Sequence, residues 1–195
     1  SDLFFSEYGE GSSNHKYIEI YNPTSSAISL AGYTVYLSGN GGSYTNTFTS
    51  NASIASGDVY VVSTNQADSI IQAAADTILS YPSIVHFNGD DALILFDGTD
   101  TIDVIGVPGV DPGSSWPVGS GSTANHTLVR MASITGGTTD WTTGALEWDV
   151  YPQNTWTYIG SHSSSCLSGG GGGPLPGACS DLFFSEYGEG SSNHK

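Results

Sequence analysis

The sequence predicts an all-β fold, an antiparallel β-sandwich with one short helix. Two observations lead to this prediction. Short runs rich in Val, Ile, Tyr, Phe and Thr recur along most of the chain, and turn residues such as Gly, Asn, Asp and Pro separate them. About ten short strands at this spacing are typical of a β-sandwich.

The predicted strands are residues 3–6, 17–21, 33–37, 44–48, 59–63, 84–87, 92–96, 101–105, 128–131 and 155–159. Turn sequences separate several of them, such as Asn-Gly-Asp-Asp at 88–91 and Asp-Gly-Thr at 97–99. One Ala-rich segment, residues 66–79, instead has four aliphatic residues at helical spacing: Ile70, Ile71, Ala74 and Ile78. We therefore expect a short helix at about 66–79, capped by Thr64 or Asn65, over one end of the sandwich.

An exact repeat divides the chain. The sequence SDLFFSEYGEGSSNHK occupies residues 1–16 and again residues 180–195, so an offset of 179 residues defines one unit. We predict a β-sandwich domain at residues 1–160, a linker at 161–179 and a second copy of the opening segment at 180–195. This second copy is interpreted as the start of a next repeat, as a strand donated to a neighbour, or as an engineered extension.

The linker has the composition of a flexible tether. It reads SHSSSCLSGGGGGPLPGAC, with five consecutive glycines followed by Pro-Leu-Pro. Its two cysteines, Cys166 and Cys179, have no zinc-type spacing, and the surrounding composition is typical of extracellular proteins. We therefore predict a disulfide at these positions, either within one unit or between units.

The chain is strongly acidic. It has 3 Lys and Arg against 19 Asp and Glu, a formal net charge of -16. Such a surface repels phosphate, so we expect no binding to nucleic acid. The Ser-, Thr-, Asn- and Gly-rich composition favours an extracellular or cell-surface bacterial protein over an acidic cytosolic one, and without a long apolar run we expect no membrane insertion.

Several motifs carry a family resemblance. These are FFSEYGEGSSNHKYIEIYNPT at 4–24, ISLAGYTVYL at 28–37 and FNGDDALIL at 87–95. Together with later segments they cover about residues 4–159, and the combination resembles the lamin tail domain of secreted bacterial proteins. The resemblance implies an immunoglobulin-like β-sandwich that acts as a non-catalytic accessory module beside secreted nucleases, in surface proteins or in repeat arrays. Nuclear members contact DNA, a role that the acidity of this chain disfavours.

Three glutamates lie close in sequence to the first lysine. Glu7, Glu10 and Glu19 flank Lys16, and we predict that Lys16 forms a structural ion pair with one or more of these carboxylates to brace the first two strands. The alternative is a covalent isopeptide bond from Lys16 to an Asn or Asp, assisted by a glutamate.

A second acidic group forms a compact predicted turn. Asn88, Asp90 and Asp91 supply oxygen ligands of the kind that Ca²⁺ prefers. Because the spacing matches no known calcium loop, a solvated hairpin turn is the alternative. Beyond this calcium site, we expect no cofactor.

The sequence contains no catalytic motif. GxSxG, HExxH and Gly-rich phosphate loops are absent, so we expect that the protein is not an enzyme. Five aromatic residues could form a carbohydrate-binding platform or fill the core: Trp116, Trp141, Trp148, Tyr151 and Trp156.

The sequence therefore favours a non-catalytic extracellular structural protein, whose domains link head to tail into a fibre or surface array and whose partners are copies of itself. The apolar residues of the repeated segment are the predicted assembly residues: Leu3, Phe4, Phe5, Leu182, Phe183 and Phe184. The alternative is a glycan- or Ca²⁺-binding accessory module of a larger secreted protein.

Overall fold

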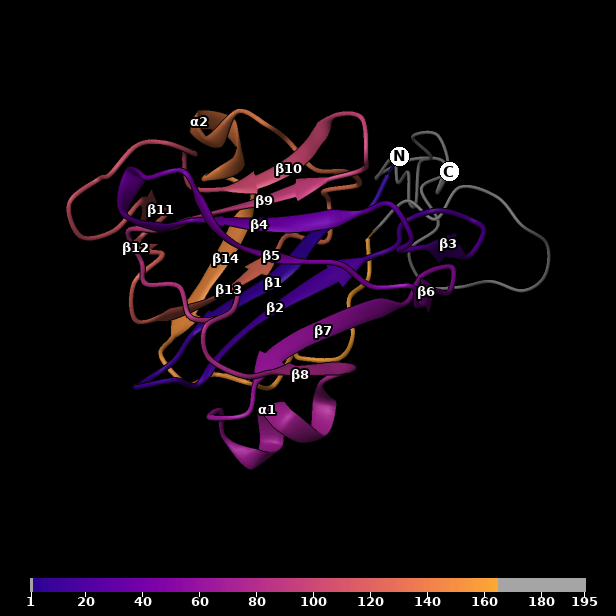
Figure 1. The fold of residues 1–195 in the computed structure, drawn as a ribbon, viewed down its shortest axis with the longest axis horizontal. Helices are drawn as coiled ribbons and strands as arrows, with labels where there is room; N and C mark the ends of the chain where they lie inside the picture. The colour runs from indigo at the N-terminus through magenta and orange to yellow at the C-terminus, as the bar shows by residue number, and fades with distance from the viewer. Residues whose placement is uncertain (1, 165–195) are drawn as a thin grey trace, which may run out of the picture.

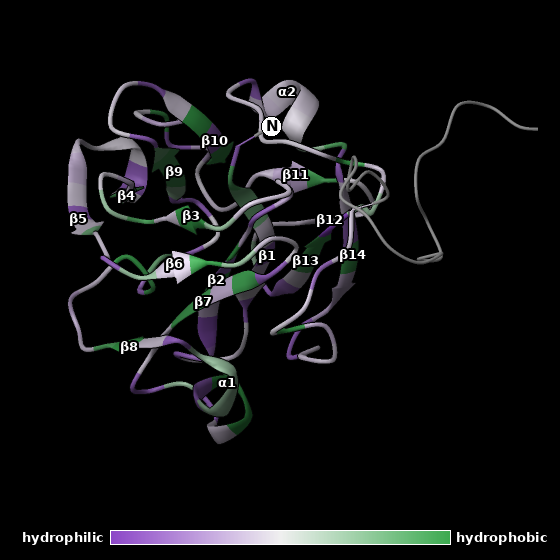
Figure 2. Cartoon of the chain, turned by 90° about the vertical axis from the view of Figure 1, so that its right-hand side faces the viewer, coloured by the Kyte–Doolittle hydropathy of each residue, from purple (hydrophilic) through white to green (hydrophobic). Residues whose placement is uncertain are grey.

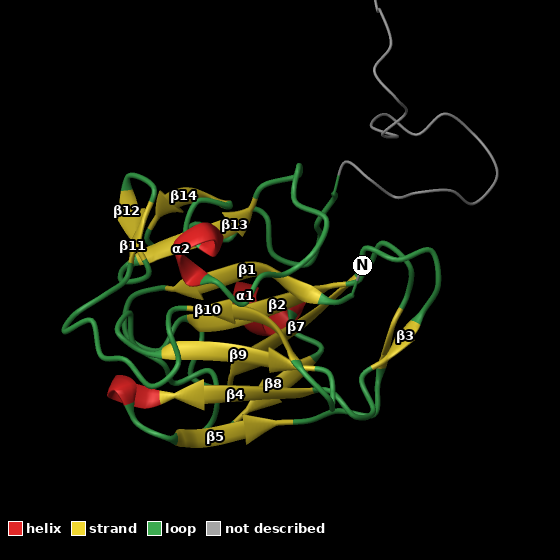
Figure 3. Ribbon diagram, turned by 90° about the horizontal axis from the view of Figure 1, so that it is seen from above, coloured by secondary structure: helices red, strands yellow, loops and turns green. Residues whose placement is uncertain are grey.

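The computed structural model of the chain describes residues 2–164 (Figure 1). Two main sheets form a sandwich. The six-stranded sheet has the order β14-β13-β1-β2-β7-β8, and the four-stranded sheet has the order β10-β9-β4-β5. In Figure 3 the strands of the four-stranded sheet lie side by side in one row. The predicted all-β, immunoglobulin-like sandwich is confirmed.

The strands of the six-stranded sheet are β1 (Phe4–Glu10), β2 (Lys16–Tyr21), β7 (Val59–Thr64), β8 (Thr77–Leu79), β13 (His126–Arg130) and β14 (Trp148–Pro152). Those of the four-stranded sheet are β4 (Thr34–Ser38), β5 (Tyr44–Phe48), β9 (Ala92–Phe96) and β10 (Thr101–Ile105). Two small ribbons pair β3 (Ile28–Ser29) with β6 (Ser53–Ile54) and β11 (Pro117–Val118) with β12 (Gly121–Ser122). The helical elements are η1 (Gly39–Gly41), α1 (Ser69–Ala74) and α2 (Trp141–Gly144).

The core lies between the two main sheets. Phe5, Tyr8 and Ile18 come from the six-stranded sheet, and Leu93 and Leu95 come from the four-stranded sheet; all five are almost completely buried. Figure 2 shows hydrophobic stretches on strands of both sheets. Burial of each large apolar side chain contributes roughly 1.5–3 kcal/mol, so this layer supplies most of the favourable free energy of folding.

Two predicted strands are wrong. Residues 84–87 form a turn and a loop, although Ile84, Val85 and Phe87 are fully buried. The apolar run therefore reflects a loop that packs into the core. Residues 155–159 are also irregular, and the last strand of the sheet is β14, which pairs with β13 over five residues.

The predicted helix is too long. Helix α1 covers only Ser69–Ala74, and its N-cap is Asp68, whose side chain accepts a hydrogen bond from the Ile70 backbone N–H. The last predicted helical residues form β8, which pairs in parallel with β7. Of the predicted apolar face, Ile71 is buried whereas Ile70 and Ile78 are exposed. Residues 2–164 contain no helix that is long and apolar enough to cross a membrane.

Candidate functional site

The first copy of the repeated segment forms an interior strand. β1 pairs with β2 on one edge and with β13 on the other, both antiparallel. All seven residues of β1 are buried. The segment therefore needs hydrogen-bonding partners on both edges and cover on both faces.

The predicted assembly residues of this copy are fully buried. Leu3 and Phe5 belong to the sandwich core, whereas Phe4 packs against Tyr21 and His162, with ring centroids 5.5 and 5.9 Å away. A register shift between Phe5 and Glu7 marks a β-bulge in the pairing of β1 with β2. The second copy, with Leu182, Phe183 and Phe184, lies outside the described residues, as do Cys166 and Cys179.

An ion pair fixes the backbone at this bulge. Arg130 donates from Nε to the Phe5 carbonyl oxygen at 3.1 Å, and it binds Asp103 from Nη2. Asp103 in turn accepts the Phe5 N–H at 2.8 Å. Arg130 and Asp103 thus hold both backbone polar groups of Phe5 and tie β1 to β10 of the other sheet.

The side chain of Arg130 lies among aromatic rings. Its side chain is completely buried, and its guanidinium carbon lies 4.3 Å from the centre of the Trp148 ring. Glu147 provides a second carboxylate, 2.9 Å from Nη1. Arg130 and Asp103 belong to no motif that marks a functional site in the sequence; the one available signal is that Arg130 and Lys16 are the only Lys or Arg residues in residues 1–179.

Lys16, at the start of β2, has three polar neighbours. Its ammonium group donates to the Phe87 carbonyl oxygen, lies 3.1 Å from Asn88 Oδ1 and lies 3.5 Å from Glu10 Oε1. Both Lys16 and Glu10 are buried. Within residues 2–164, Glu10 is the carboxylate that pairs with Lys16; Glu7 and Glu19 have other partners.

Glu7 and Glu19 lie directly opposite each other on β1 and β2. Glu7 accepts a hydrogen bond from the Tyr17 hydroxyl, and Glu19 accepts bonds from the Ser6 hydroxyl and the Gly160 N–H, both at 2.7 Å. Burial raises the pKa of Glu7 to about 8 and that of Glu19 to about 7. These two carboxyl groups therefore carry protons at mildly acidic pH.

The comparisons with known proteins agree with this fold. The lamin tail domain family model matches residues 1–109, more than half of the chain. The chain belongs to the lamin tail domain family. Members of this family are immunoglobulin-like and generally non-enzymatic. Searches of curated proteins and of solved structures found no match.

The family match ends before the sandwich is complete. Residues 1–109 of this lamin tail domain contain β1 to β10, whereas β13 and β14 follow later in the chain. β13, which lies outside the matched residues, pairs with one edge of β1. The repeated segment therefore needs residues beyond 109 to complete its hydrogen bonds.

Two of the three predicted calcium residues of this lamin tail domain, Asn88 and Asp91, already have protein partners. Asp91 accepts the backbone N–H groups of Asn40 and Asn88 at 2.8 and 2.7 Å, and Asn88 faces Lys16. Asp90 has one buried oxygen without a hydrogen-bond partner. No group of three or more His, Cys, Asp or Glu side chains in residues 2–164 is arranged to hold a metal ion. Calcium binding stays a prediction.

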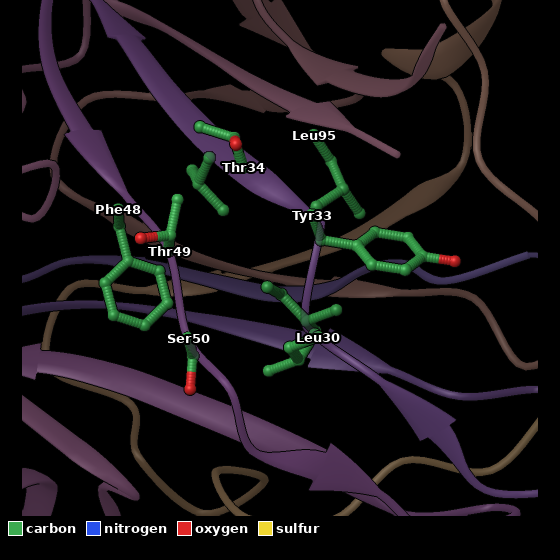
Figure 4. Close-up of a pocket in the computed structure, with 9 residues that line it drawn as sticks. Leu30, Tyr33, Thr34, Phe48, Thr49, Ser50 and Leu95 are labelled. Atoms are coloured by element: carbon green, nitrogen blue, oxygen red, sulfur yellow. The ribbon is translucent and has the colours of Figure 1, made fainter. Parts of the chain in front are cut away.

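The lamin tail domain keeps most of its tryptophans inside. Trp116, Trp141 and Trp148 are buried, so these three residues pack in the core and are not displayed on the surface as a carbohydrate-binding platform would require. An apolar cavity of about 10 Å³ lies between the sheets, lined by residues that include Leu30, Phe48 and Leu95 (Figure 4). A cavity of this size has room for at most about one water molecule.

Proposed function

We propose that this lamin tail domain is a non-catalytic, extracellular structural module of a bacterial fibre or surface array. Its units join head to tail through the repeated segment, and its partners are copies of itself. The observation that carries this proposal is the interior position of β1, which lies between β2 and β13. Residues 180–195 repeat the sequence of residues 1–16, so they are expected to need the same two neighbouring strands.

The repeated segment is poorly suited to bind at the free edge of a sheet. An edge strand bonds on one side and leaves the other side open. The β1 sequence is buried on both faces and paired on both edges, so a second copy at an edge would leave apolar surface exposed. Residues 180–195 are thus expected to occupy the β1 position of another unit, either the next domain of the same chain or a neighbouring chain.

Head-to-tail joining of this kind is heterologous. It generates an open filament unless the rotation between units closes a ring. The tether at 161–179 sets the reach between one unit and the next. The strong negative charge of each unit keeps long assemblies soluble.

Three shortened chains test the proposal. We expect chain 1–179 to be folded and monomeric, and chain 17–179, which lacks both copies, to be unfolded. Chain 17–195 is expected to fold by placing residues 180–195 in the β1 position of a neighbour and to form oligomers that grow with concentration. Circular dichroism and light scattering measure both properties.

A matched pair of variants distinguishes specific docking from hydrophobic stickiness. Gly188 is the counterpart of Gly9, where an added Cβ would lie 2.2 Å from Cε1 of the buried Tyr17 ring. In chain 17–195, Gly188→Ala is expected to abolish oligomers, whereas Ser192→Gly, at the counterpart of the exposed Ser13, leaves them unchanged. If chain 17–195 folds but stays monomeric at every concentration, head-to-tail joining through this segment is wrong.

A further inference from the structure

Two residues of one hairpin meet a third residue, distant in sequence, at one end of the sandwich. Glu10 ends β1, Lys16 begins β2, and Asn88 lies in the loop that precedes β9. Lys16 Nζ lies 3.1 Å from Asn88 Oδ1 and 3.5 Å from Glu10 Oε1. A primary amine, a carboxamide and a carboxyl group are thus in contact in one buried cluster, which we call the Lys16 cluster.

The Lys16 cluster is buried beside an apolar wall. Lys16 and Glu10 are 6 % and 7 % exposed, and the ring of the fully buried Phe87 lies 5.7 Å from Lys16 Nζ. Tyr8 stacks on Phe87 and extends this apolar wall. Burial raises the pKa of the Glu10 carboxyl above its ordinary value. Glu10 Oε1, which lies 3.5 Å from Lys16 Nζ, is therefore placed to exchange protons with the amine during bond formation.

The loop that carries Asn88 is held firmly. The Asn88 N–H donates to Asp91 Oδ2 at 2.7 Å, and Thr123 donates to the Gly89 carbonyl oxygen. Glu10 is fixed as well, because its Oε2 accepts the Asn125 N–H. Reacting groups held about 3–3.5 Å apart react as if at very high concentration, so this rigidity assists bond formation.

We propose that Lys16 and Asn88 become joined by an intramolecular isopeptide bond, with Glu10 as the catalytic residue. The neutral Lys16 Nζ attacks Asn88 Cγ, and a new Nζ–Cγ bond forms. Glu10, which holds the first proton given up by the ammonium group, donates it to Nδ2 and accepts the second proton from Nζ; the Cγ–Nδ2 bond breaks, and one ammonia leaves. The step needs no oxidant, reductant or co-reactant, and the product is a secondary amide that links β2 of one sheet to the loop preceding β9 of the other.

Intact mass spectrometry of the purified full chain tests the bond. We expect a mass lower than that of the plain sequence by one ammonia, and we expect trypsin to leave the chain uncut after Lys16, because an acylated lysine is no substrate. A mass equal to that of the plain sequence in the folded protein overturns the proposal.

Three variants assign the roles. Glu10→Gln and Lys16→Arg are expected to retain the mass of their plain sequences, with circular dichroism to verify that they fold. Asn88→Asp offers a sharper readout, because its bond would release water in place of ammonia. The Asn88→Asp protein and the parent protein would therefore converge on the same final mass, a result that no structural role of Asn88 produces.

The second copy of the segment carries the same two side chains. Glu189 and Lys195 are the counterparts of Glu10 and Lys16, offset by 179 residues. This extension rests on the proposed function: when residues 180–195 occupy the β1 position of a neighbour, Lys195 would bond to Asn88 of that neighbour. Chain 17–195 should then give a ladder of bands that resists boiling in detergent, and Lys195→Arg should remove the ladder. Oligomers without a ladder would contradict the bond between chains and leave head-to-tail joining intact.

Discussion

Replacing Arg130 with methionine is expected to lower the free energy of unfolding by about 3–5 kcal/mol, the usual cost of breaking a buried ion pair from one side. The variant leaves the fully buried Asp103 without its cation, and it removes the donor to the Phe5 carbonyl oxygen. Urea unfolding followed by tryptophan fluorescence measures the loss.

Two further variants separate the charge from the packing. Arg130→Met combined with Asp103→Leu is expected to recover part of the loss, because no unpaired buried charge remains. Glu147→Gln serves as the matched control: Glu147 is the more exposed partner of Arg130, and its loss is expected to cost less than about 1 kcal/mol. If Glu147→Gln and Arg130→Met lower the free energy of unfolding equally, the ion pair of Arg130 with Asp103 contributes no more to stability than the pair with Glu147.

The domain is expected to lose stability as the pH rises from about 4.5 to about 8. Glu7 and Glu19 have pKa values raised by burial to about 8 and about 7, from an ordinary 4.5. Between these limits the folded state binds more protons than the unfolded state, so the stabilisation is complete below about pH 4.5 and is lost through the folded pKa values. Each group contributes a slope of up to about 1.4 kcal/mol per pH unit.

Urea midpoints at several pH values across this range measure the effect. Glu7→Gln is expected to flatten the profile above about pH 7, because the amide keeps an oxygen for the Tyr17 hydroxyl but cannot titrate. Asp97→Asn is the control, since Asp97 lies at an exposed turn where backbone N–H groups lower its pKa. A flat profile in the parent protein would contradict the raised pKa values of the glutamate pair.

Local signals predicted the hairpins well. The strands at 92–96 and 101–105 were predicted with the bounds that β9 and β10 have, because the Asp-Gly turn between them and their β-branched residues agree with the final pairing. The strand predicted at 84–87 is wrong because Ile84, Val85 and Phe87 are apolar for a different reason: they pack into the core from a loop. Periodicity alone does not distinguish a buried loop from a short strand.

Tertiary contacts decided the remaining elements. The Ala-rich segment from 66 looked helical as far as 79, but Thr77–Leu79 gains backbone hydrogen bonds by pairing with β7. The contact of Lys16 with Glu10 was accessible from the sequence, because the two residues face each other across one hairpin. Asn88 is 72 residues from Lys16, so only the packing of the two sheets brings these side chains together.

The position of the Lys16 cluster has a mechanical consequence. Lys16 and Asn88 bracket residues 17–87, which include β2 after its first residue and the whole of β4, β5 and β7. With an amide bond between these two side chains, tension applied along the chain would pass directly from Lys16 to Asn88. The strands between them would bear no load and could not be pulled out, so each unit would lengthen far less under force than its number of residues suggests.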